Sequence, residues 1–364
     1  MNERLVVVGG DAAGMSAASQ ARRARPDLEI IAFERSSFVS YSACGEPYYV
    51  GGLVESLDKL VARTPAQFAQ TNIEVRTRHE VTEIDLDRRT VTALSLGDGR
   101  SIEVGFDKLM YSTGSRPLRP QSIAGIEDPE VFGLRTLEDA GRLKVRADQG
   151  PARGVIVGGG YIGIEVAEVL VDRGWQVTMV TSGEHVLERT LDNQMGELAD
   201  RAVRSYGVDL LTGSRVTAFE RRSTEHLVSG EGFELSADLV VIGLGAGPDV
   251  ELARAAGIGL GSTGAVAVDD RQAASVAGVW SAGDCTEARH RVTGQPVNIL
   301  LGTVANKTGR IAGINLAGGN ARFPGVLGTA ITRIGTTEIS RTGLKVAEAK
   351  AAGFAPVVGF ARGT

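Results

Sequence analysis

The chain has 364 residues, enough for two to three domains of roughly 150 residues each. It is 43% hydrophobic and 23% charged, with a formal net charge of −5, and this mild acidity without a basic run argues against a nucleic-acid or anionic-membrane surface. No stretch of about 18 uninterrupted apolar residues occurs, and Met1–Val8 lacks a basic segment followed by an apolar one, so we expect neither a membrane span nor a signal peptide.

The first predicted elements form a dinucleotide-binding unit. A β-branched run over Arg4–Val8 predicts a buried parallel strand, and a glycine-rich turn over Gly9–Gly14 leads into a helix over Met15–Arg25. A second apolar strand, Glu29–Phe33, ends in Glu34. In such units the pyrophosphate binds at the helix N-terminus, and a carboxylate about 20 residues further on binds a ribose 2′-hydroxyl. The second glycine of the usual pattern is an aspartate here, so the interpretation depends on the flanking strands and on the carboxylate.

One cysteine follows this unit, within the stretch Ser40–Tyr48, directly ahead of a predicted helix. Unpaired N–H groups and the helix dipole at that place would favour the Cys44 thiolate. The alternative is a small buried apolar residue, which is what many lone cysteines are. The only other cysteine, Cys285, is far away in sequence, so we expect no disulfide framework, which fits a reducing cytoplasm.

The chain then changes character. A short helix is predicted over Thr64–Asn72, and Ile73–Val104 alternates as antiparallel strands do, with a turn at Gly97–Gly99. Phe106–Pro117 predicts a strand that ends in small residues and a proline. We expect a linker into a new domain after this proline.

A second and complete dinucleotide unit follows. Gly154–Val157 predicts its first strand, Gly158–Gly163 holds all three glycines of the pattern, and the next helix carries Glu165. Trp175–Val180 predicts the second strand, which ends in Thr181. The carboxylate that would bind the 2′-hydroxyl of NAD is therefore missing. Its negative charge, which would repel the 2′-phosphate of NADP, is missing as well. The cofactor choice stays open and favours NADPH.

The remaining elements complete a doubly wound arrangement. Val203–Leu235 alternates like antiparallel strands, and Asp238–Gly245 predicts a strand like the one near Leu109. Val279–Asp284 predicts a strand that closes in Gly-Asp. Ligands sit at carboxyl edges of such sheets, so we expect Asp284 to contact one, although it could also cap a following helix.

Two dinucleotide units and one placed cysteine predict an electron relay. A nicotinamide would supply hydride, a flavin would accept it, and Cys44 would pass electrons on.

The chain resembles the FAD-dependent pyridine nucleotide-disulfide oxidoreductases of the single-cysteine class, and within them the coenzyme A-disulfide reductases. The resemblance covers nearly all residues. It is carried by the motifs GGDAAG with Glu34, SYSACGEPY, YSTGSRP, GGGYIGIE and SAGDC, and by Leu301–Lys307 and Gly325–Ala330. It implies an α/β fold with two Rossmann-like domains, for FAD over 1–117 and 242–320 and for NAD(P)H over 118–241. Residues 324–364 would begin an α+β dimer-interface domain.

The resemblance also implies site residues and no metal. Cys44 would be the redox nucleophile. The cofactors would be bound by Gly9, Ala13, Gly14, Glu34, Arg35, Ser42, Val81, Thr113, Gly114, Asp284, Gly158, Gly160, Tyr161, Ile162, Gly163, Glu165, Thr181 and Gly243. A coenzyme A site would be lined by Ser16, Gln20, Arg23, Ser40 and Asn306. Arginine suits phosphate recognition, although Arg22 and Arg23 could equally form a solvated helix face.

Several positions depart from the family pattern. Tyr41 replaces a phenylalanine, Ala43 replaces an asparagine, which weakens the case for coenzyme A, and Asn306 stands where some relatives have a histidine. A second redox cysteine is absent because Tyr49 occupies its position. Cys44 would therefore cycle through a mixed disulfide with substrate or through a sulfenic acid. Cys285 is expected to serve packing.

Two functional alternatives stay open. An NADH oxidase or peroxidase would use a Cys44 sulfenic acid, but those relatives carry a histidine where this chain has Ala12 and usually lack the pair Pro47–Tyr48. A non-enzymatic redox sensor has little support. The disulfide reductase, acting on coenzyme A disulfide or a polysulfide, is the favoured interpretation.

The last residues resemble only the start of the interface domain, with a strand over Thr329–Ile334 and a helix over Lys345–Ala352. One strand and one helix cannot close a core. We therefore expect a piece of a longer, homodimeric protein that binds and reduces FAD but dimerises poorly and turns over disulfide slowly.

Overall fold

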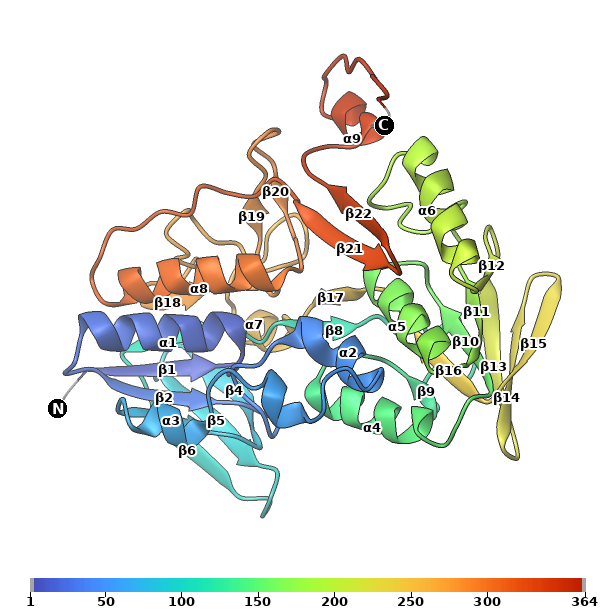
Figure 1. Ribbon diagram of the computed structural model, residues 1–364. Coiled ribbons are helices and arrows are strands. Elements are labelled where there is room, and N and C mark those ends of the chain that lie inside the picture. Colours follow the sequence, from blue (N-terminus) through green and yellow to red (C-terminus); the bar gives the residue numbers. More distant parts are fainter. Residues whose placement is uncertain (1–2, 362–364) are drawn as a thin grey trace.

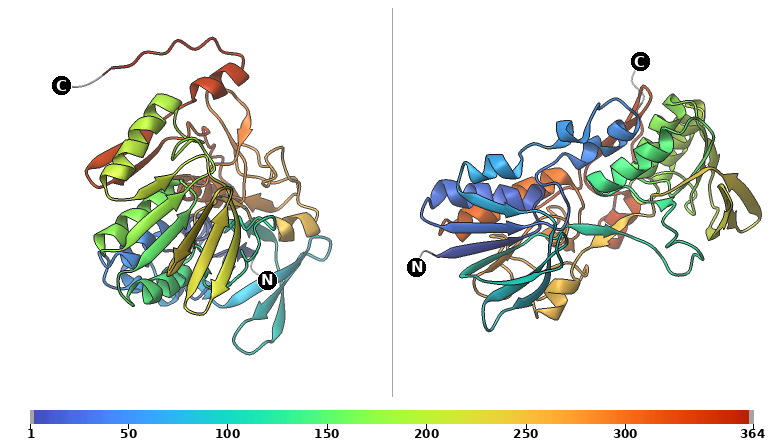
Figure 2. Two further views of the ribbon diagram at one scale, coloured as in Figure 1. Left: turned by 90° about the vertical axis from the view of Figure 1, so that its right-hand side faces the viewer. Right: turned by 90° about the horizontal axis from the view of Figure 1, so that it is seen from below.

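Two parallel five-stranded sheets organise residues 3–361, the part of the chain that the computed structural model describes (Figure 1). The first sheet contains, in spatial order, β18 (Val279–Ser281), β7 (Lys108–Tyr111), β1 (Arg4–Val8), β2 (Glu29–Phe33) and β3 (Ile73–Arg76). The second contains β12 (Asp209–Leu211), β11 (Gln176–Val180), β10 (Arg153–Val157), β16 (Leu239–Ile242) and β9 (Val131–Phe132). Viewed from below, the two units lie side by side (Figure 2, right).

Each unit has three layers. In the first, α1 (Ala12–Ala24), α3 (Pro65–Ala69) and α8 (Gly302–Leu316) cover one face of the sheet. The strands β4 (His79–Asp85), β5 (Thr90–Ser95) and β6 (Ser101–Gly105), with α7 (Glu251–Ala255), cover the other. In the second unit, α4 (Leu137–Ala147), α5 (Tyr161–Asp172) and α6 (Asn193–Ser205) face β13 (Val216–Arg222), β14 (Glu225–Gly230) and β15 (Phe233–Ala237) across the sheet. The buried strands are rich in β-branched residues, as strands covered on both faces are.

Helices α1 and α8 approach each other closely, through small residues. A Cβ atom built on Gly309 would lie 2.2 Å from the carbonyl oxygen of Ala13, and one on Gly313 would lie 2.4 Å from that of Ala17. Only glycine fits at these two places on α8. The N-terminal half of α1, which leads out of the first glycine turn, is therefore held against α8.

Short elements connect and extend the two units. The remaining elements are η1 (Ala43–Gly45), α2 (Glu46–Val50), η2 (Leu57–Leu60), β8 (Ser115–Pro117), β17 (Ala246–Pro248), β19 (Ala288–Arg289), β20 (Pro296–Val297), β21 (Ala330–Ile334), β22 (Thr337–Arg341) and α9 (Val346–Ala351). β8 pairs with β17 where the chain passes between the two units, and β21 pairs with β22 as a hairpin. After α9 the chain runs on in an extended segment (Figure 2, left). Among residues 3–361, no helix has the length and apolarity that crossing a membrane requires.

Three predicted elements need correction. The strand at Ile73 is parallel, because it pairs with β2 at the edge of the first sheet and only β4 to β6 are antiparallel. Residues 203–205 end α6, and the strand β12 that follows them is also parallel. The helix expected from Met15 begins at Ala12, since two alanines allow it to start inside the glycine turn.

Other predictions from the linker and the C-terminal region also change. Phe106–Pro117 contains two strands, β7 and β8, which belong to different sheets. The expected strand near Thr329 and the helix after Lys345 are present, but β22 was missed. β22 makes the segment a hairpin, whose residue Ile334 is buried in the core of the second unit.

Candidate functional site

The first glycine turn has the tight backbone that a dinucleotide unit requires. Gly9 has φ +99°, and a Cβ there would lie 2.1 Å from the Ser112 carbonyl oxygen, while one on Gly14 would lie 2.0 Å from the Gly9 carbonyl oxygen. Both positions therefore admit only glycine. The Glu34 carboxylate accepts hydrogen bonds from the N–H groups of Gly10 and Ser36, each at 2.8 Å, which places it at the turn as predicted.

Four segments that are distant in sequence meet beside this turn. Asp284 follows β18. Its carboxylate forms an ion pair with Arg135 and accepts a hydrogen bond from the Ser115 hydroxyl at 3.0 Å. The Thr113 hydroxyl donates to the carbonyl oxygen of Asp249 at 2.6 Å. No described helix begins at Asp284, so the capping alternative is wrong. Arg135 was missed because only the folded chain brings it to this carboxylate.

Other residues predicted for the first unit lie around these. Gly114 has φ +77° and open space where a Cβ would point, so its backbone is accessible. Arg35 lies 3.7 Å from the Asp249 carboxylate, and Val81 packs against an apolar cluster of the first unit. Ser42 is exposed, one residue before η1.

The second glycine turn repeats the same geometry. Gly158 has φ +117° and a Cβ there would lie 2.3 Å from the Gly243 carbonyl oxygen, while one on Gly163 would lie 2.1 Å from the Gly158 carbonyl oxygen. Beyond Gly160, the nearest atom is 3.9 Å from a built Cβ, so the N-terminus of α5 is open to a ligand. Tyr161, Ile162 and Gly163 form its first turn. The backbone of both turns thus fits a pyrophosphate at a helix N-terminus.

The end of β11 carries no carboxylate of its own, as predicted. Thr181 is buried there, and its N–H donates to the Leu211 carbonyl oxygen at 2.9 Å. The chain then folds back, so that a Cβ on Gly183 would lie 2.3 Å from a carboxylate oxygen of Glu188. Glu188 therefore places a negative charge beside the strand end, which the strand-end pattern did not reveal.

Cys44 lies in η1 and is exposed. The prediction that its position favours the thiolate is wrong for this structure: its pKa is raised by loss of surrounding water and by the negative charges of Glu165 and Glu46, against the opposing charge of Arg135. The helix ahead of it, α2, has only five residues and supplies little dipole. The influence of Glu165 shows that α5 of the second unit lies near Cys44, since α2 packs on α5.

Two carboxyl groups in this part of the site were also missed, the buried Glu46 and the half-buried Asp11. Glu46 is 3% exposed, and its Oε1 atom has no hydrogen-bond partner. Burial raises the pKa of Glu46 to about 8; Arg135 opposes this shift, and nearby acidic residues add to it. Burial also raises the pKa of Asp11 to about 6, although Asp11 accepts a hydrogen bond from the Tyr41 N–H at 3.1 Å. An acidic residue within a polar stretch of sequence gives no sign that its carboxyl group will lose water in the folded protein.

The predicted coenzyme A residues gather around α1. The Ser16 hydroxyl donates to Asn306 of α8 at 2.9 Å, and Arg23 donates to the Gln20 side chain at 2.6 Å. Ser40 has φ +49°, and its N–H donates to the Gly10 carbonyl oxygen at 3.0 Å. The neighbouring Arg22 instead holds backbone carbonyl groups, among them that of Asn72 at 2.6 Å, so its role is structural.

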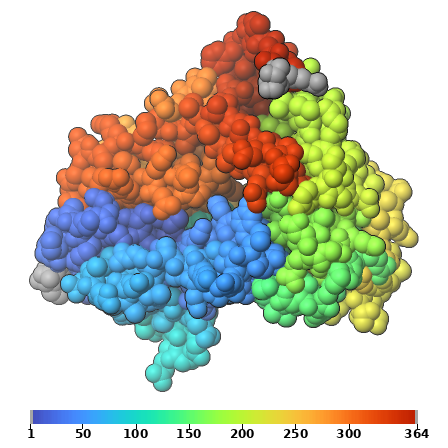
Figure 3. Space-filling view, viewed as in Figure 1, coloured from blue at the N-terminus to red at the C-terminus, as the bar shows by residue number. Residues whose placement is uncertain are grey.

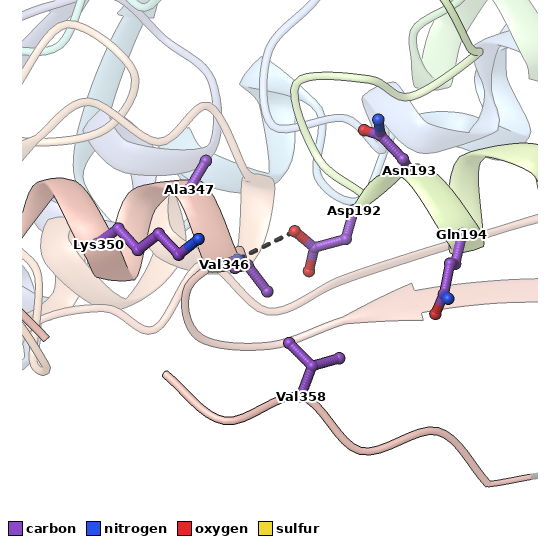
Figure 4. Close-up of a pocket in the computed structure, with 7 residues that line it drawn as sticks. All are labelled: Asp192, Asn193, Gln194, Val346, Ala347, Lys350 and Val358. Carbon is purple, nitrogen blue, oxygen red and sulfur yellow. Dashed lines mark hydrogen bonds between the residues drawn. The ribbon is translucent and has the colours of Figure 1, made fainter. Parts of the chain in front are cut away.

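A hollow of about 350 Å³ between α6 and α9 lies outside all predicted site residues (Figure 4). It is lined by Asp192, Asn193, Gln194, Val346, Ala347, Lys350 and Val358. The Val346 N–H donates to the Asp192 carboxylate at 3.0 Å across it. This hollow lies where α9 and the segment after it contact the start of α6.

Comparison with known proteins identifies the family. The sequence model of the pyridine nucleotide-disulphide oxidoreductases matches residues 3–309, so the chain belongs to this family. The resemblance drawn from the motifs is thereby confirmed, together with the α/β fold of two Rossmann-type units. FAD and NAD(P)H are the cofactors of the family and of this chain.

Individual relatives are informative as well. The chain is 36% identical over 356 residues to the NAD(P)H coenzyme A polysulfide/persulfide reductase of Pyrococcus horikoshii, covering 97% of this chain and 78% of the relative. It is 32% identical to an NADH oxidase of Methanocaldococcus jannaschii, covering 99% of this chain and 80% of the relative.

Solved structures agree with these relatives. A NAD-dependent persulfide reductase from A. fulgidus matches with a TM-score of 0.92 and 37% identity, over 96% of this chain and 66% of that one. A reduced CoADR-RHD protein of Bacillus anthracis matches with a TM-score of 0.93 and 30% identity, over 98% of this chain and 64% of that one. The chain thus spans just under two thirds of the length of these two proteins.

Proposed function

We propose that the protein is a flavin-dependent oxidoreductase that passes electrons from NAD(P)H through FAD to Cys44 and on to a low-molecular-weight disulfide, either coenzyme A disulfide or a polysulfide. The observation that carries this proposal is the exposed Cys44 between the two dinucleotide units, near Glu165 of the second. The relatives named for coenzyme A disulfide, polysulfide and persulfide reduction support the substrate class.

We assign the first unit to FAD and the second to NAD(P)H. The FAD-binding domain would comprise residues 1–117 and 242–320, and the NAD(P)H-binding domain residues 118–241. Glu34 and Asp284 lie at the carboxyl edge of the first sheet, where ligands bind in doubly wound folds. Arg135, which pairs with Asp284, adds a cation suited to a pyrophosphate. Once bound, NAD(P)H supplies a hydride and FAD relays its electron pair to sulfur.

Cys44 then performs thiol–disulfide exchange. Its thiolate attacks one sulfur of the substrate, so that a bond from Sγ to that sulfur forms, the substrate disulfide breaks, and the leaving thiolate takes up a proton. Cys285 cannot resolve the mixed disulfide, since it is fully buried and its Sγ contacts the Ala282 carbonyl oxygen at 3.4 Å. The mixed disulfide between Cys44 and the substrate would therefore be reduced by the electron pair that bound FAD would supply, which regenerates the Cys44 thiolate and, with one proton, releases the second substrate thiol.

The substrate would bind along α1 through Ser16, Gln20, Arg23, Ser40 and Asn306. Residues 16, 20 and 23 share one face of the helix, and all three already form polar pairs, Ser16 with Asn306 and Gln20 with Arg23. Arg23 is exposed and would meet a phosphate of coenzyme A. A polysulfide needs no such contact, so the effect of an Arg23 substitution distinguishes the two substrates.

The second candidate is an NADH oxidase, because relatives of that name are 32% and 31% identical to the chain. The test measures oxidation of NADPH and of NADH with coenzyme A disulfide, with a polysulfide, with peroxide and with oxygen alone. We expect one of the sulfur substrates to be reduced at least about tenfold faster than oxygen. Rapid oxygen or peroxide reduction without disulfide turnover would establish the oxidase or peroxidase instead.

Cofactor preference gives the first prediction about a variant. The end of β11 lacks a carboxylate and Glu188 is exposed to screening by water, so we expect NADPH to be used at least as well as NADH. Thr181→Glu should shift the preference towards NADH by about 1–2 kcal/mol, through repulsion of the 2′-phosphate. The ratio of kcat/KM for the two nucleotides measures this shift.

Glu188→Gln is the matching test of the loop charge. It should move the same ratio towards NADPH, in the opposite direction to Thr181→Glu. A strong preference of the unaltered protein for NADH, or a ratio that Thr181→Glu leaves unchanged, would contradict the assignment of this edge to the ribose.

Assembly and location belong to the proposal as well. We propose that the protein, at its full length, is a cytoplasmic homodimer whose subunits meet through the region after residue 324. Its described residues expose the apolar side chains of Phe354, Val357, Val358 and Phe360, and both cysteines are free thiols, which suits a reducing compartment. Light scattering of the protein, with and without Val357→Asp, tests the interface.

A further inference from the structure

The hairpin of β21 and β22 lies on α5, the helix that follows the second glycine turn (Figures 1 and 3). Thr332 of β21 is only 6% exposed, and its hydroxyl donates to Glu165 Oε1 at 3.2 Å. One turn further along α5, Glu168 Oε1 accepts the Gly335 N–H at 2.9 Å. Ile334 anchors the hairpin in the core of the second unit. The hairpin thus binds both carboxylates on this face of α5.

These two contacts differ in kind. Gly335 donates a backbone N–H, so its hydrogen bond to Glu168 does not depend on which side chains the hairpin carries. Thr332 uses a buried hydroxyl, and it meets the carboxylate that lies just after the second glycine turn, on the side facing Cys44. Docking of the hairpin is already provided by Gly335 and Ile334, so the hydroxyl is available for another role.

We propose that Thr332 is a positioning residue for Glu165, holding its carboxylate in place to accept a hydrogen bond from the carboxamide of the bound nicotinamide. This inference rests on the proposed function, in which the second unit binds NAD(P)H. The carboxamide N–H group is the hydrogen-bond donor of the nicotinamide ring, and an ionised carboxylate only accepts.

The surroundings of Glu165 make its ionisation depend on this hydroxyl. Burial raises the pKa of Glu165, the hydrogen bond from Thr332 lowers it, and the negative charge of Glu168 raises it further. The other titratable or charged groups around it are Tyr161 on α5, Cys44 on η1, and Arg333 on β21, which lies 4.0 Å from Glu168. Without the hydroxyl, the half-buried Glu165 carboxylate would lose this partner and hold its proton to higher pH.

The test uses the flavin-loaded protein and the variants Thr332→Val, Thr332→Ser and Thr329→Val. Thr329 is the matched control, because its hydroxyl pairs with Thr342 at 2.7 Å on the exposed part of the same segment. Flavin reduction by NADPH and NADH is followed from about pH 5 to about pH 9, and affinity for NADP⁺ is measured over the same range without turnover.

Thr332→Val should raise the KM for the reduced nucleotide about tenfold with a smaller change in kcat, and weaken NADP⁺ binding similarly. Because Glu165 must be ionised, activity is lost as pH falls through its pKa, and this acid limb should move about one pH unit upward in Thr332→Val. Thr332→Ser and Thr329→Val should match the unaltered protein.

An unchanged KM and acid limb in Thr332→Val, with only lower thermal stability, would overturn the proposal, as would an equal shift in Thr332→Ser. Thr332→Ala replaces the valine variant if that protein does not fold. If the unaltered protein binds NADP⁺ but its flavin is not reduced, the proposed function fails, while the pH dependence of NADP⁺ binding still decides the role of Thr332.

Discussion

Cys44→Ser is expected to lower disulfide turnover by at least about a thousandfold while FAD stays bound and is still reduced by NAD(P)H. A serine hydroxyl is a far weaker nucleophile than a thiolate and cannot form the mixed disulfide. The side chain at position 44 is exposed and lies outside both glycine turns, so neither cofactor should be lost. Steady-state turnover with coenzyme A disulfide measures disulfide reduction, and anaerobic reduction of the flavin by NAD(P)H measures the earlier step separately.

Cys285→Ser provides the matched control. Cys285 is fully buried beside Ser281 and should tolerate the change with full turnover, at some cost in stability for burying a more polar group. Undiminished disulfide reduction in Cys44→Ser would rule out its role as nucleophile. Loss of flavin reduction in that variant would mean that Cys44 supports the cofactors instead.

Glu46→Gln is expected to stabilise the protein at alkaline pH. Burial raises the pKa of Glu46 from 4.5 to about 8, so below about pH 4.5 both folded and unfolded states hold the proton. Between these values the unfolded chain releases the proton and the folded protein keeps it, so the free energy of unfolding falls as pH rises. Each pKa unit corresponds to about 1.4 kcal/mol, so the rise from 4.5 to about 8 represents a loss of roughly 4–5 kcal/mol at pH 8. Because a buried glutamine amide also lacks full hydrogen bonding, we expect Glu46→Gln to recover about 2–3 kcal/mol of it.

Chemical denaturation at about pH 5 and about pH 8 measures this difference. At the lower pH the variant and the unaltered protein should differ little. Glu55→Gln is the control, because the Glu55 side chain is 78% exposed and pairs with Lys59 at the surface. An identical pH dependence for Glu46→Gln and the unaltered protein would show that Glu46 ionises freely in the folded state.

Both glycine turns could be predicted from the sequence because their constraints are local. A positive φ at Gly9 or Gly158, and a carbonyl oxygen about 2 Å from any Cβ, leave glycine as the only choice and so leave a readable pattern. The strands beside them are β-branched for an equally local reason. The family and the fold follow from these signals.

What could not be predicted depends on contacts between distant residues. Arg135 and Asp284 are 149 positions apart, and nothing near either residue indicates their ion pair. The raised pKa of Cys44 reflects partial burial first and then the negative charges of Glu165 and Glu46, which a position ahead of a helix does not reveal. Alternation at Ile73 fits an exposed edge of a parallel sheet as well as it fits an antiparallel strand.

The close contact between α1 and α8 has a consequence for how substrate selectivity could change. Ser16 of α1 and Asn306 of α8 face each other across the same glycine-lined seam that holds the first nucleotide turn in place. The close packing of α1 against α8 therefore sets the distance between the Ser16 and Asn306 side chains, and no loop takes part in setting it. We expect substitutions at Asn306 to alter the choice of disulfide alone, whereas any side chain added at Gly309 would disturb flavin and substrate at once.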